Sequence, residues 1–108
     1  MKDEARLQHI LDAIALINIY MEEGKRDSKT KAAIERQIIT IGEAVRYISP
    51  ELKECYPLVP WQDIIGMRNI IIHEYFDVDI MTIWDTVEYH IPALYEWINN
   101  ILNSTNNK

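Results

Sequence analysis

The chain has one cysteine, three glycines and four prolines among its 108 residues. Cys55 cannot form an internal disulfide, and the pattern of a secretory leader is missing, so we expect a cytoplasmic location. So few turn residues exclude an all-β fold, and a hydrophobic fraction of 48% excludes disorder. No apolar run approaches the roughly 18 residues needed to span a bilayer. These absences predict a soluble, mostly helical protein without a membrane partner.

Basic residues are missing from the last third of the chain. Between Asn69 and Asn107 there is no Lys or Arg but there are six acidic residues, and the whole chain carries a net charge of −6. Such a protein lacks the broad basic surface that drives nonspecific nucleic-acid binding, so no DNA partner is expected. Any RNA contact must be local. We expect it to come from the modest basic cluster of Lys25, Arg26, Lys29, Lys31 and Arg36.

Apolar residues recur at intervals of three and four in the first half of the chain, which predicts two amphipathic helices. The first helix should run from Asp3 to about Glu22 and end at Gly24. Asp27 or Ser28 should cap the second helix, which continues to the Ser-Pro pair at residues 49–50. A glycine inside this second helix, Gly42, should allow another helix to pack closely.

The second half of the chain predicts a connector and two further helices. Residues 50–60 contain three prolines and should form a short helical turn and an extended link. The third helix, starting at Pro60 or Trp61, should be mostly buried. The fourth should cover residues 80–101, with Pro92 kinking it rather than ending it, and residues 103–108 should form a frayed tail. We therefore predict one all-α domain over residues 1–108, a four-helix antiparallel up-and-down bundle with a short extra helical turn.

The third helix also carries the polar residues that stand out from their apolar surroundings. Arg68, Asn69, His73 and Tyr75 form the pattern Arg-Asn-x-x-x-His-x-Tyr. On a regular helix Arg68 and Tyr75 share a face, whereas His73 points about 140° away from Arg68. Asn69 stands four residues before His73 and could orient the imidazole. An Arg-His pocket therefore requires either a distorted helix or a second copy of the chain.

An Arg and a His without a metal cluster suit RNA cleavage by the neighbouring 2′-hydroxyl. The RNA supplies the nucleophile, a His near its usual pKa of about 6.5 moves protons, and an Arg holds the phosphate oxygens. No His or Cys cluster has zinc-site spacing, so no metal ligand is expected. The structural alternative pairs Arg68 with an acid such as Glu43 or Glu74 and places His73 in the core, hydrogen-bonded.

Several segments beside this motif resemble a known family in the same order along the chain. They are Ile41–Ala44, Pro60–Trp61, Ile64–Asn69, His73, Tyr75 and Val78–Asp79. With them the sequence resembles HEPN domains, specifically the HepT-like toxins paired with MNT-type minimal nucleotidyltransferases. The resemblance implies a helical bundle that forms a homodimer with the motifs brought together, and we expect Gly66 to allow close approach at that interface.

The resemblance also implies roles for the motif residues. Arg68 and His73 would be the residues of a metal-independent endoribonuclease, supported by Asn69. Tyr75 would receive AMP from the nucleotidyltransferase antitoxin, so ATP and Mg²⁺ would serve the partner, and this chain would bind no cofactor. Two alternatives remain open. The chain could be a noncatalytic substrate-binding subunit of the nucleotidyltransferase, or a purely structural helical dimer.

Overall fold

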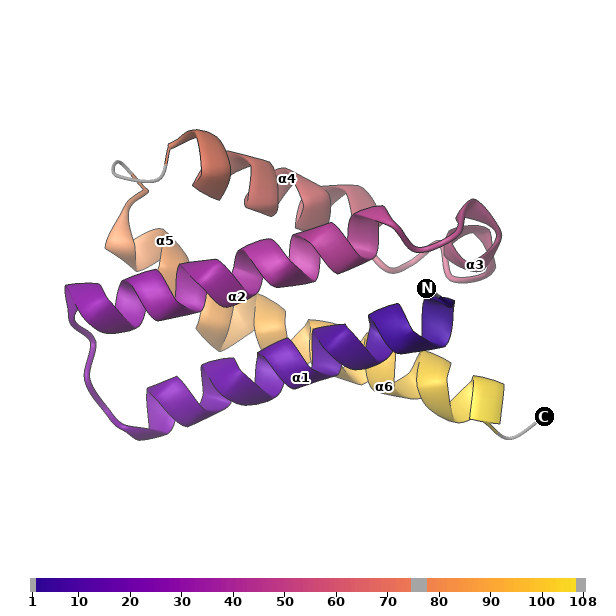
Figure 1. Cartoon of the computed structure of the whole chain (residues 1–108), viewed down its shortest axis with the longest axis horizontal. Coiled ribbons are helices and arrows are strands. Elements are labelled where there is room, and N and C mark those ends of the chain that lie inside the picture. The colour runs from indigo at the N-terminus through magenta and orange to yellow at the C-terminus, as the bar shows by residue number, and fades with distance from the viewer. Residues whose placement is uncertain (1, 75–77, 107–108) are drawn as a thin grey trace.

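The computed structural model describes residues 2–74 and 78–106, and every regular element in them is helical (Figure 1). The predicted all-α class is confirmed. In chain order the elements are α1 (Asp3–Glu22), α2 (Ser28–Arg46), α3 (Pro50–Cys55), α4 (Trp61–His73), α5 (Ile80–Asp85), the π-helix η1 (Thr86–His90) and α6 (Ile91–Asn106). None of the helices in this part of the chain combines the length and the apolar character needed to cross a membrane.

The ends of the first three helices follow from local signals. Gly24 has a φ of 72°, a left-handed conformation that suits glycine, just beyond α1. Asp27 caps α2 by accepting a hydrogen bond from the backbone N–H of Thr30. Ser49 caps α3 by accepting one from Leu52. The end of α1 and the Asp27 cap are those that the sequence predicts, because such signals act within one turn of the chain. Helix α2 ends earlier than predicted, at Arg46 rather than at the Ser-Pro pair, and Ser49 caps the next helix instead.

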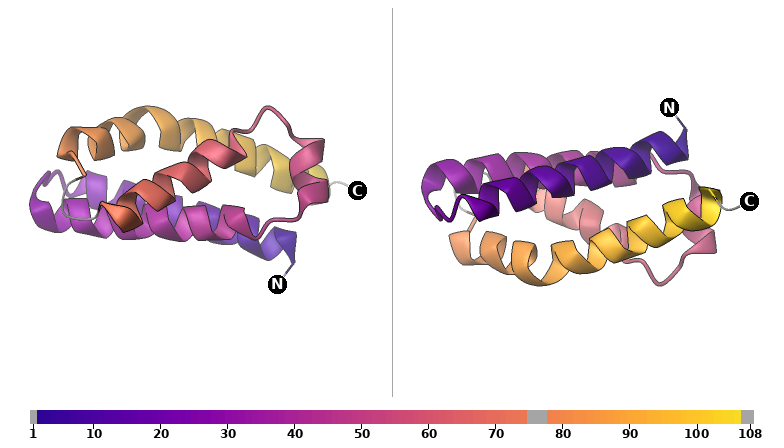
Figure 2. Two further views of the ribbon diagram at one scale, coloured as in Figure 1. Left: turned by 90° about the horizontal axis from the view of Figure 1, so that it is seen from above. Right: turned by 90° about the horizontal axis from the view of Figure 1, so that it is seen from below.

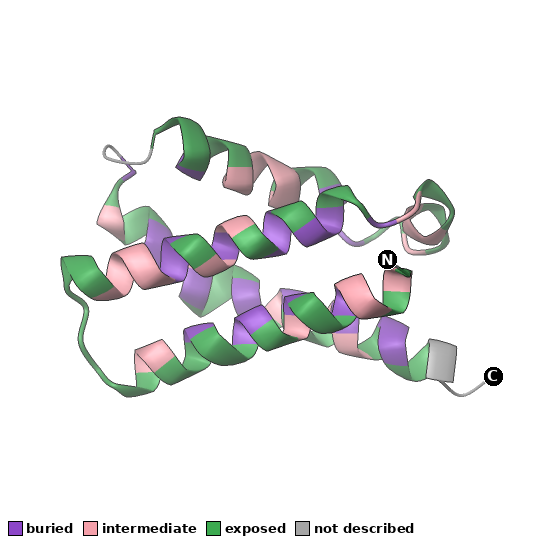
Figure 3. Ribbon diagram, in the orientation of Figure 1, coloured by how far each residue is buried: buried purple, intermediate pink, exposed green. Residues whose placement is uncertain are grey.

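Helix α2 lies between α1 and α4, and α1 packs on its other side against α6 (Figures 1 and 2). Buried residues recur along these helices, as the burial colouring shows (Figure 3). The fully buried large side chains are Leu7, Ile10, Ile14, Ile17, Ile34, Ile41, Val45, Ile71, Ile83, Ile98 and Ile101. Nearly all of them belong to the predicted stripes of α1, α2 and the last helix, so those stripes form the core.

Helix α4 differs from the mostly buried helix that the sequence predicts. Only Trp61 and Ile71 are buried in it. Ile70 is 49% exposed and Ile72 41% exposed. The reason is that α4 packs chiefly along α2, and Ile70 and Ile72 lie on parts of its surface that the described chain covers only partly. Helix α4 therefore has more apolar residues than one copy of the chain buries.

The last long helix is interrupted where Pro92 follows the π-helix. Pro92 has no N–H to donate to the carbonyl four residues earlier, and its ring crowds that carbonyl. The helical turn widens by one residue instead. The N–H of Ile91 donates a hydrogen bond to the carbonyl oxygen of Thr86, five residues back. The helix is thus distorted rather than ended. Helix α6 then continues through Asn106, into the segment predicted to fray.

Candidate active site

Arg68 lies where α4 crosses α2 at Gly42. A Cβ atom added to Gly42 would strike the Cβ of Arg68 and come within 2.8 Å of its Cγ. The absence of a side chain at Gly42 therefore lets the stem of Arg68 lie directly on the α2 backbone, as the sequence predicts for this glycine. The guanidinium is held at this crossing rather than swinging freely in solvent.

Three contacts define the environment of the Arg68 guanidinium. Its Nη1 donates to Oδ1 of Asn69 at 2.9 Å, and its Nη2 lies 3.5 Å from Oε1 of Glu43. Its Nε is buried without a hydrogen-bond partner. The pairing of Arg68 with Glu43, one of the two acids considered from the sequence, is therefore present. Because the Glu43 side chain is 54% exposed, this pair is solvent-screened and contributes little to stability.

His73 lies in the last turn of α4 and is exposed, not in the core. The alternative that places His73 in the core is therefore wrong. Since α4 is a continuous α-helix, Arg68 and His73 remain about 140° apart around its axis and roughly 7.5 Å apart along it. Asn69 bonds Arg68 in this structure. Tyr75 lies outside the described residues.

The basic cluster singled out in the sequence is partly engaged within the protein. Arg26 lies over the ring of Trp84, 5.5 Å from its centroid, and ties the α1–α2 loop to α5. Lys31 pairs with the buried Glu35 at 3.4 Å. Within the described residues no three His, Cys, Asp or Glu side chains are grouped so that they could hold a metal ion.

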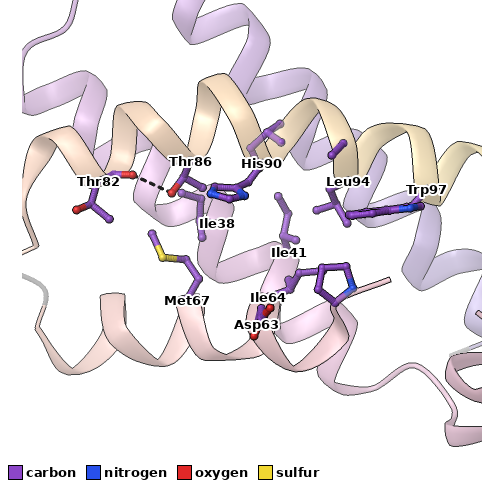
Figure 4. A pocket seen from close by; sticks show the side chains of 13 residues that line it. Ile38, Ile41, Asp63, Ile64, Met67, Thr82, Thr86, His90, Leu94 and Trp97 are labelled. Atoms are coloured by element: carbon purple, nitrogen blue, oxygen red, sulfur yellow. Dashed lines mark hydrogen bonds between the residues drawn. The ribbon is translucent and has the colours of Figure 1, made fainter. Parts of the chain in front are cut away.

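A separate cavity of about 350 Å³ opens between α4, α2 and the helix formed by α5, η1 and α6 (Figure 4). Its walls are mainly apolar, with Met67 and Leu94 among them, and polar groups come from Asp63, Thr86 and His90. Neither Arg68 nor His73 lines it. Sequence reasoning missed Asp63 and set His90 aside, because each stands on a different amphipathic helix with no motif around it.

Comparison with known proteins identifies the family to which the chain belongs. The profile of the HepT-like family, described as ribonuclease HepT-like, matches residues 9–101. A candidate RNase of Methanocaldococcus jannaschii is 36% identical over 91 residues, which cover 84% of this chain and 75% of that protein. No solved structure gives a significant match.

Two further relatives come from other organisms. A candidate RNase of Caldanaerobacter subterraneus subsp. tengcongensis is 37% identical over 101 residues, covering 89% of this chain and 90% of that protein. A candidate ribonuclease HepT of Thermococcus cleftensis is 39% identical over 93 residues, covering 82% of this chain and 84% of that protein. The family profile covers most of this chain, and these three relatives align with this chain over most of their own lengths. The chain therefore belongs to the HepT-like ribonuclease family of HEPN domains.

Proposed function

We propose that this chain is a metal-independent endoribonuclease and the toxin of a toxin-antitoxin pair. The observation that carries the proposal is the placement of Arg68, whose guanidinium is anchored by Gly42 and Asn69 at a surface crossing of two helices. Family membership and the RNase names of the relatives support RNA as the substrate. The half-exposed Glu43 can give way to a phosphate, which is a stronger partner for a planar guanidinium.

In this proposal the RNA supplies the attacking group. The 2′-oxygen attacks the adjacent phosphorus while His73 accepts its proton, and the charge that develops on the nonbridging oxygens is stabilised by Arg68. The bond to the 5′-oxygen breaks, and that oxygen takes a proton from the imidazolium or from water. The products are a 2′,3′-cyclic phosphate end and a free 5′-hydroxyl. Asn69 acts as a positioning residue that holds Arg68.

A dimer completes the proposed site. Arg68 and His73 of one chain point about 140° apart, so a phosphate cannot contact both of them on the surface of one regular helix. A twofold pair of HEPN-like four-helix bundles, with α5–α6 counted as one helix, would bring the Arg of one copy near the His of the other. Ile70 and Ile72, on opposite flanks of the buried Ile71, leave apolar side chains exposed on α4 that such a contact can cover.

Cleavage in EDTA tests the ribonuclease. The purified wild-type protein should cut RNA to 2′,3′-cyclic phosphate ends in the presence of EDTA. Arg68→Ala or His73→Ala should lower the rate by 100-fold or more, since each removes a group acting in the transition state. His9→Ala is the matched control, because His9 is an exposed histidine on α1, and it should cleave normally. Equal cleavage by all four proteins would refute the assigned sites.

Control by a partner is the second part of the proposal. An MNT-type nucleotidyltransferase with ATP and Mg²⁺ should transfer AMP to the hydroxyl of Tyr75, releasing pyrophosphate. The added phosphate charge would repel RNA phosphate near His73. Mass spectrometry should show one or more AMP units on the wild type and none on Tyr75→Phe, while Tyr89→Phe, a variant of an exposed tyrosine, should still be modified. A modified and silenced Tyr75→Phe protein would mean that another residue is used.

The cavity beside α4 favours one second candidate, the noncatalytic subunit of a nucleotidyltransferase. Its volume of about 350 Å³ is in the range of small-molecule sites, and Asp63 and His90 could orient a bound group. In that case wild-type protein would cleave no RNA, and a nucleotidyltransferase supplied with it would transfer nucleotide to a small acceptor. His90→Ala should then lower that transfer.

A further inference from the structure

A second group of basic and aromatic side chains lies at the C-terminal end of α2. The guanidinium carbon of Arg6 is 5.1 Å from the centroid of the Tyr47 ring, and that of Arg46 is 5.7 Å from it. Asp3 holds this end together, because its carboxylate accepts hydrogen bonds from the backbone N–H and the hydroxyl of Ser49. The start of α1 is thereby fixed beside the end of α2 (Figure 1).

These three side chains are placed for contact with something outside the chain. Tyr47 is 59% exposed, and Arg46 is exposed too. Arg6 has a buried Nε without a hydrogen-bond partner, and among the described residues neither arginine has an acidic partner within ion-pair distance. Two unpaired guanidinium groups beside one open aromatic ring are unusual in a chain with a net charge of −6.

Stability of the fold does not account for this arrangement. Arg6 stands in the first turns of α1, where the helix dipole is unfavourable to a cation. An exposed cation–π contact contributes little, about as much as it costs to order one long side chain. The chemistry that uses both groups is that of a single-stranded nucleic acid, whose phosphates bind guanidinium and whose bases stack on aromatic rings.

The cluster lies in line with the proposed cleavage site. Arg46 follows Gly42 by one turn of α2, about 6 Å, and Gly42 contacts Arg68. Helices α2 and α4 run in opposite directions (Figure 1), so His73 lies roughly 7.5 Å beyond Arg68 on the far side from Arg46. An RNA strand that passes Arg68 can therefore reach Tyr47 within a few nucleotides.

We propose that Arg6, Arg46 and Tyr47 form a docking site for single-stranded RNA, separate from the reactive residues. The inference rests on the proposed function for the identity of the ligand. It names a substrate contact outside the Lys25–Arg36 cluster, in which Arg26 and Lys31 are already engaged by Trp84 and Glu35.

Binding is measured apart from cleavage by giving every protein the additional His73→Ala change. A fluorescently labelled single-stranded RNA is titrated and its anisotropy recorded at several salt concentrations. Tyr47→Ala should raise the dissociation constant about fivefold or more, whereas Tyr47→Phe, which keeps the ring, should stay near the parent. Tyr95→Ala, on the acidic final helix and 41% exposed, is the matched tyrosine control and should bind like the parent.

The charges are tested through the salt dependence. Arg6→Gln and Arg46→Gln should each reduce the slope of log affinity against log salt by about 0.7, and Arg46→Lys should restore it. Arg26→Gln is the matched control, since Arg26 also lies over a ring, but a buried one. Melting curves show whether each variant is folded, so that loss of binding is not confused with unfolding. If Arg6→Gln is unstable, Arg46→Gln alone carries the test, because Arg46 is exposed on α2.

The inference and the ribonuclease can fail separately. RNA that binds through Tyr47 without being cut by the wild type would uphold the docking site and refute the enzyme. RNA binding that is absent in the parent, unchanged in Tyr47→Ala, or weakened more by Arg26→Gln than by Arg46→Gln would overturn the docking site, whether or not the wild type cleaves RNA.

Discussion

Gly42 determines how near the Arg68 side chain comes to α2. A methyl group at this position would meet the Cβ of Arg68, which is tied to the α4 backbone and cannot move aside as the end of a flexible chain would. A close helix crossing of this kind is predictable from the sequence, because a glycine inside an amphipathic stripe has few other uses. The residue opposite it is not predictable, since Gly42 and Arg68 stand on different helices.

Gly42→Ala should separate the two helices at this crossing. We expect the free energy of unfolding to fall by about 1–2 kcal/mol, since overpacking outweighs the better helix propensity of alanine. RNA cleavage should fall at least 10-fold because the guanidinium shifts. Gly66→Ala is the control: nothing lies within 4 Å of an added Cβ there, so within one chain it should be neutral or stabilising. Denaturant melts with equal stability for Gly42→Ala and wild type would contradict this account.

The Arg6–Tyr47–Arg46 group shows the limit of sequence reasoning at the residue scale. Arg6 belongs to the first turns of α1 and Tyr47 follows the last residue of α2, so no periodicity relates them. They meet because α1 and α2 pack side by side with matching lengths. The candidate motif can be read from the sequence because Arg68 and His73 lie on one helix. Their directions, about 140° apart, show that a site using both would need further residues from elsewhere in the fold or from a second copy.

At the scale of the element, the start of α2 and the end of α1 were predictable, whereas the ends of α2 and α6 and the burial of α4 were not. Caps such as Asp27 and Ser49 act on backbone groups within three residues, so the sequence contains the whole signal. Burial of α4 depends on which surfaces cover it, and an apolar sequence cannot distinguish a core of the same chain from an interface. The π-helix before Pro92 was predictable only as a distortion, because a proline can be accommodated by a kink or by a widened turn.

The cap of α2 gives a prediction with a pH dependence. The Thr30 backbone N–H donates to Asp27 and holds the pKa of that carboxyl below its usual value of 3.8. A lowered pKa means that the ionised cap stabilises the fold above the unfolded-state pKa, and that this stabilisation is lost as pH falls through the folded-state pKa. At pH 7, Asp27→Ala should lower the melting temperature most, and Asp27→Asn should lower it by less, because asparagine caps the helix without the charge.

The contrast between these variants is measured by circular dichroism melts between pH 2 and pH 7. The advantage of the wild type over Asp27→Asn should shrink as pH falls below about 4, because asparagine caps without ionising. A gap between the two proteins that is constant with pH would show that the Asp27 charge does not contribute to the cap.

At the scale of the whole molecule, the described chain leaves apolar surface that a second copy can cover. Ile70 and Ile72 are exposed on α4, Gly66 on the same helix has open space beside it, and the cavity next to Met67 is walled mainly by apolar side chains. Exposed isoleucines on a helix that also borders an apolar cavity favour an oligomer interface on α4. The divergent directions of Arg68 and His73 point to the same helix.

We therefore predict a homodimer built on α4. Sedimentation at micromolar concentration should show the wild type as a dimer, and Ile70→Glu should convert it to a folded monomer, since a charge buried against apolar side chains costs several kcal/mol. Ile19→Glu is the matched control, because Ile19 on α1 is 50% exposed and should tolerate the charge without dissociation. The monomeric Ile70→Glu variant should also lose RNA cleavage if Arg68 and His73 act across the interface. A wild type that sediments as a monomer, or a monomeric variant that cleaves RNA at the normal rate, would place the whole site within one chain and would require α4 to distort near His73.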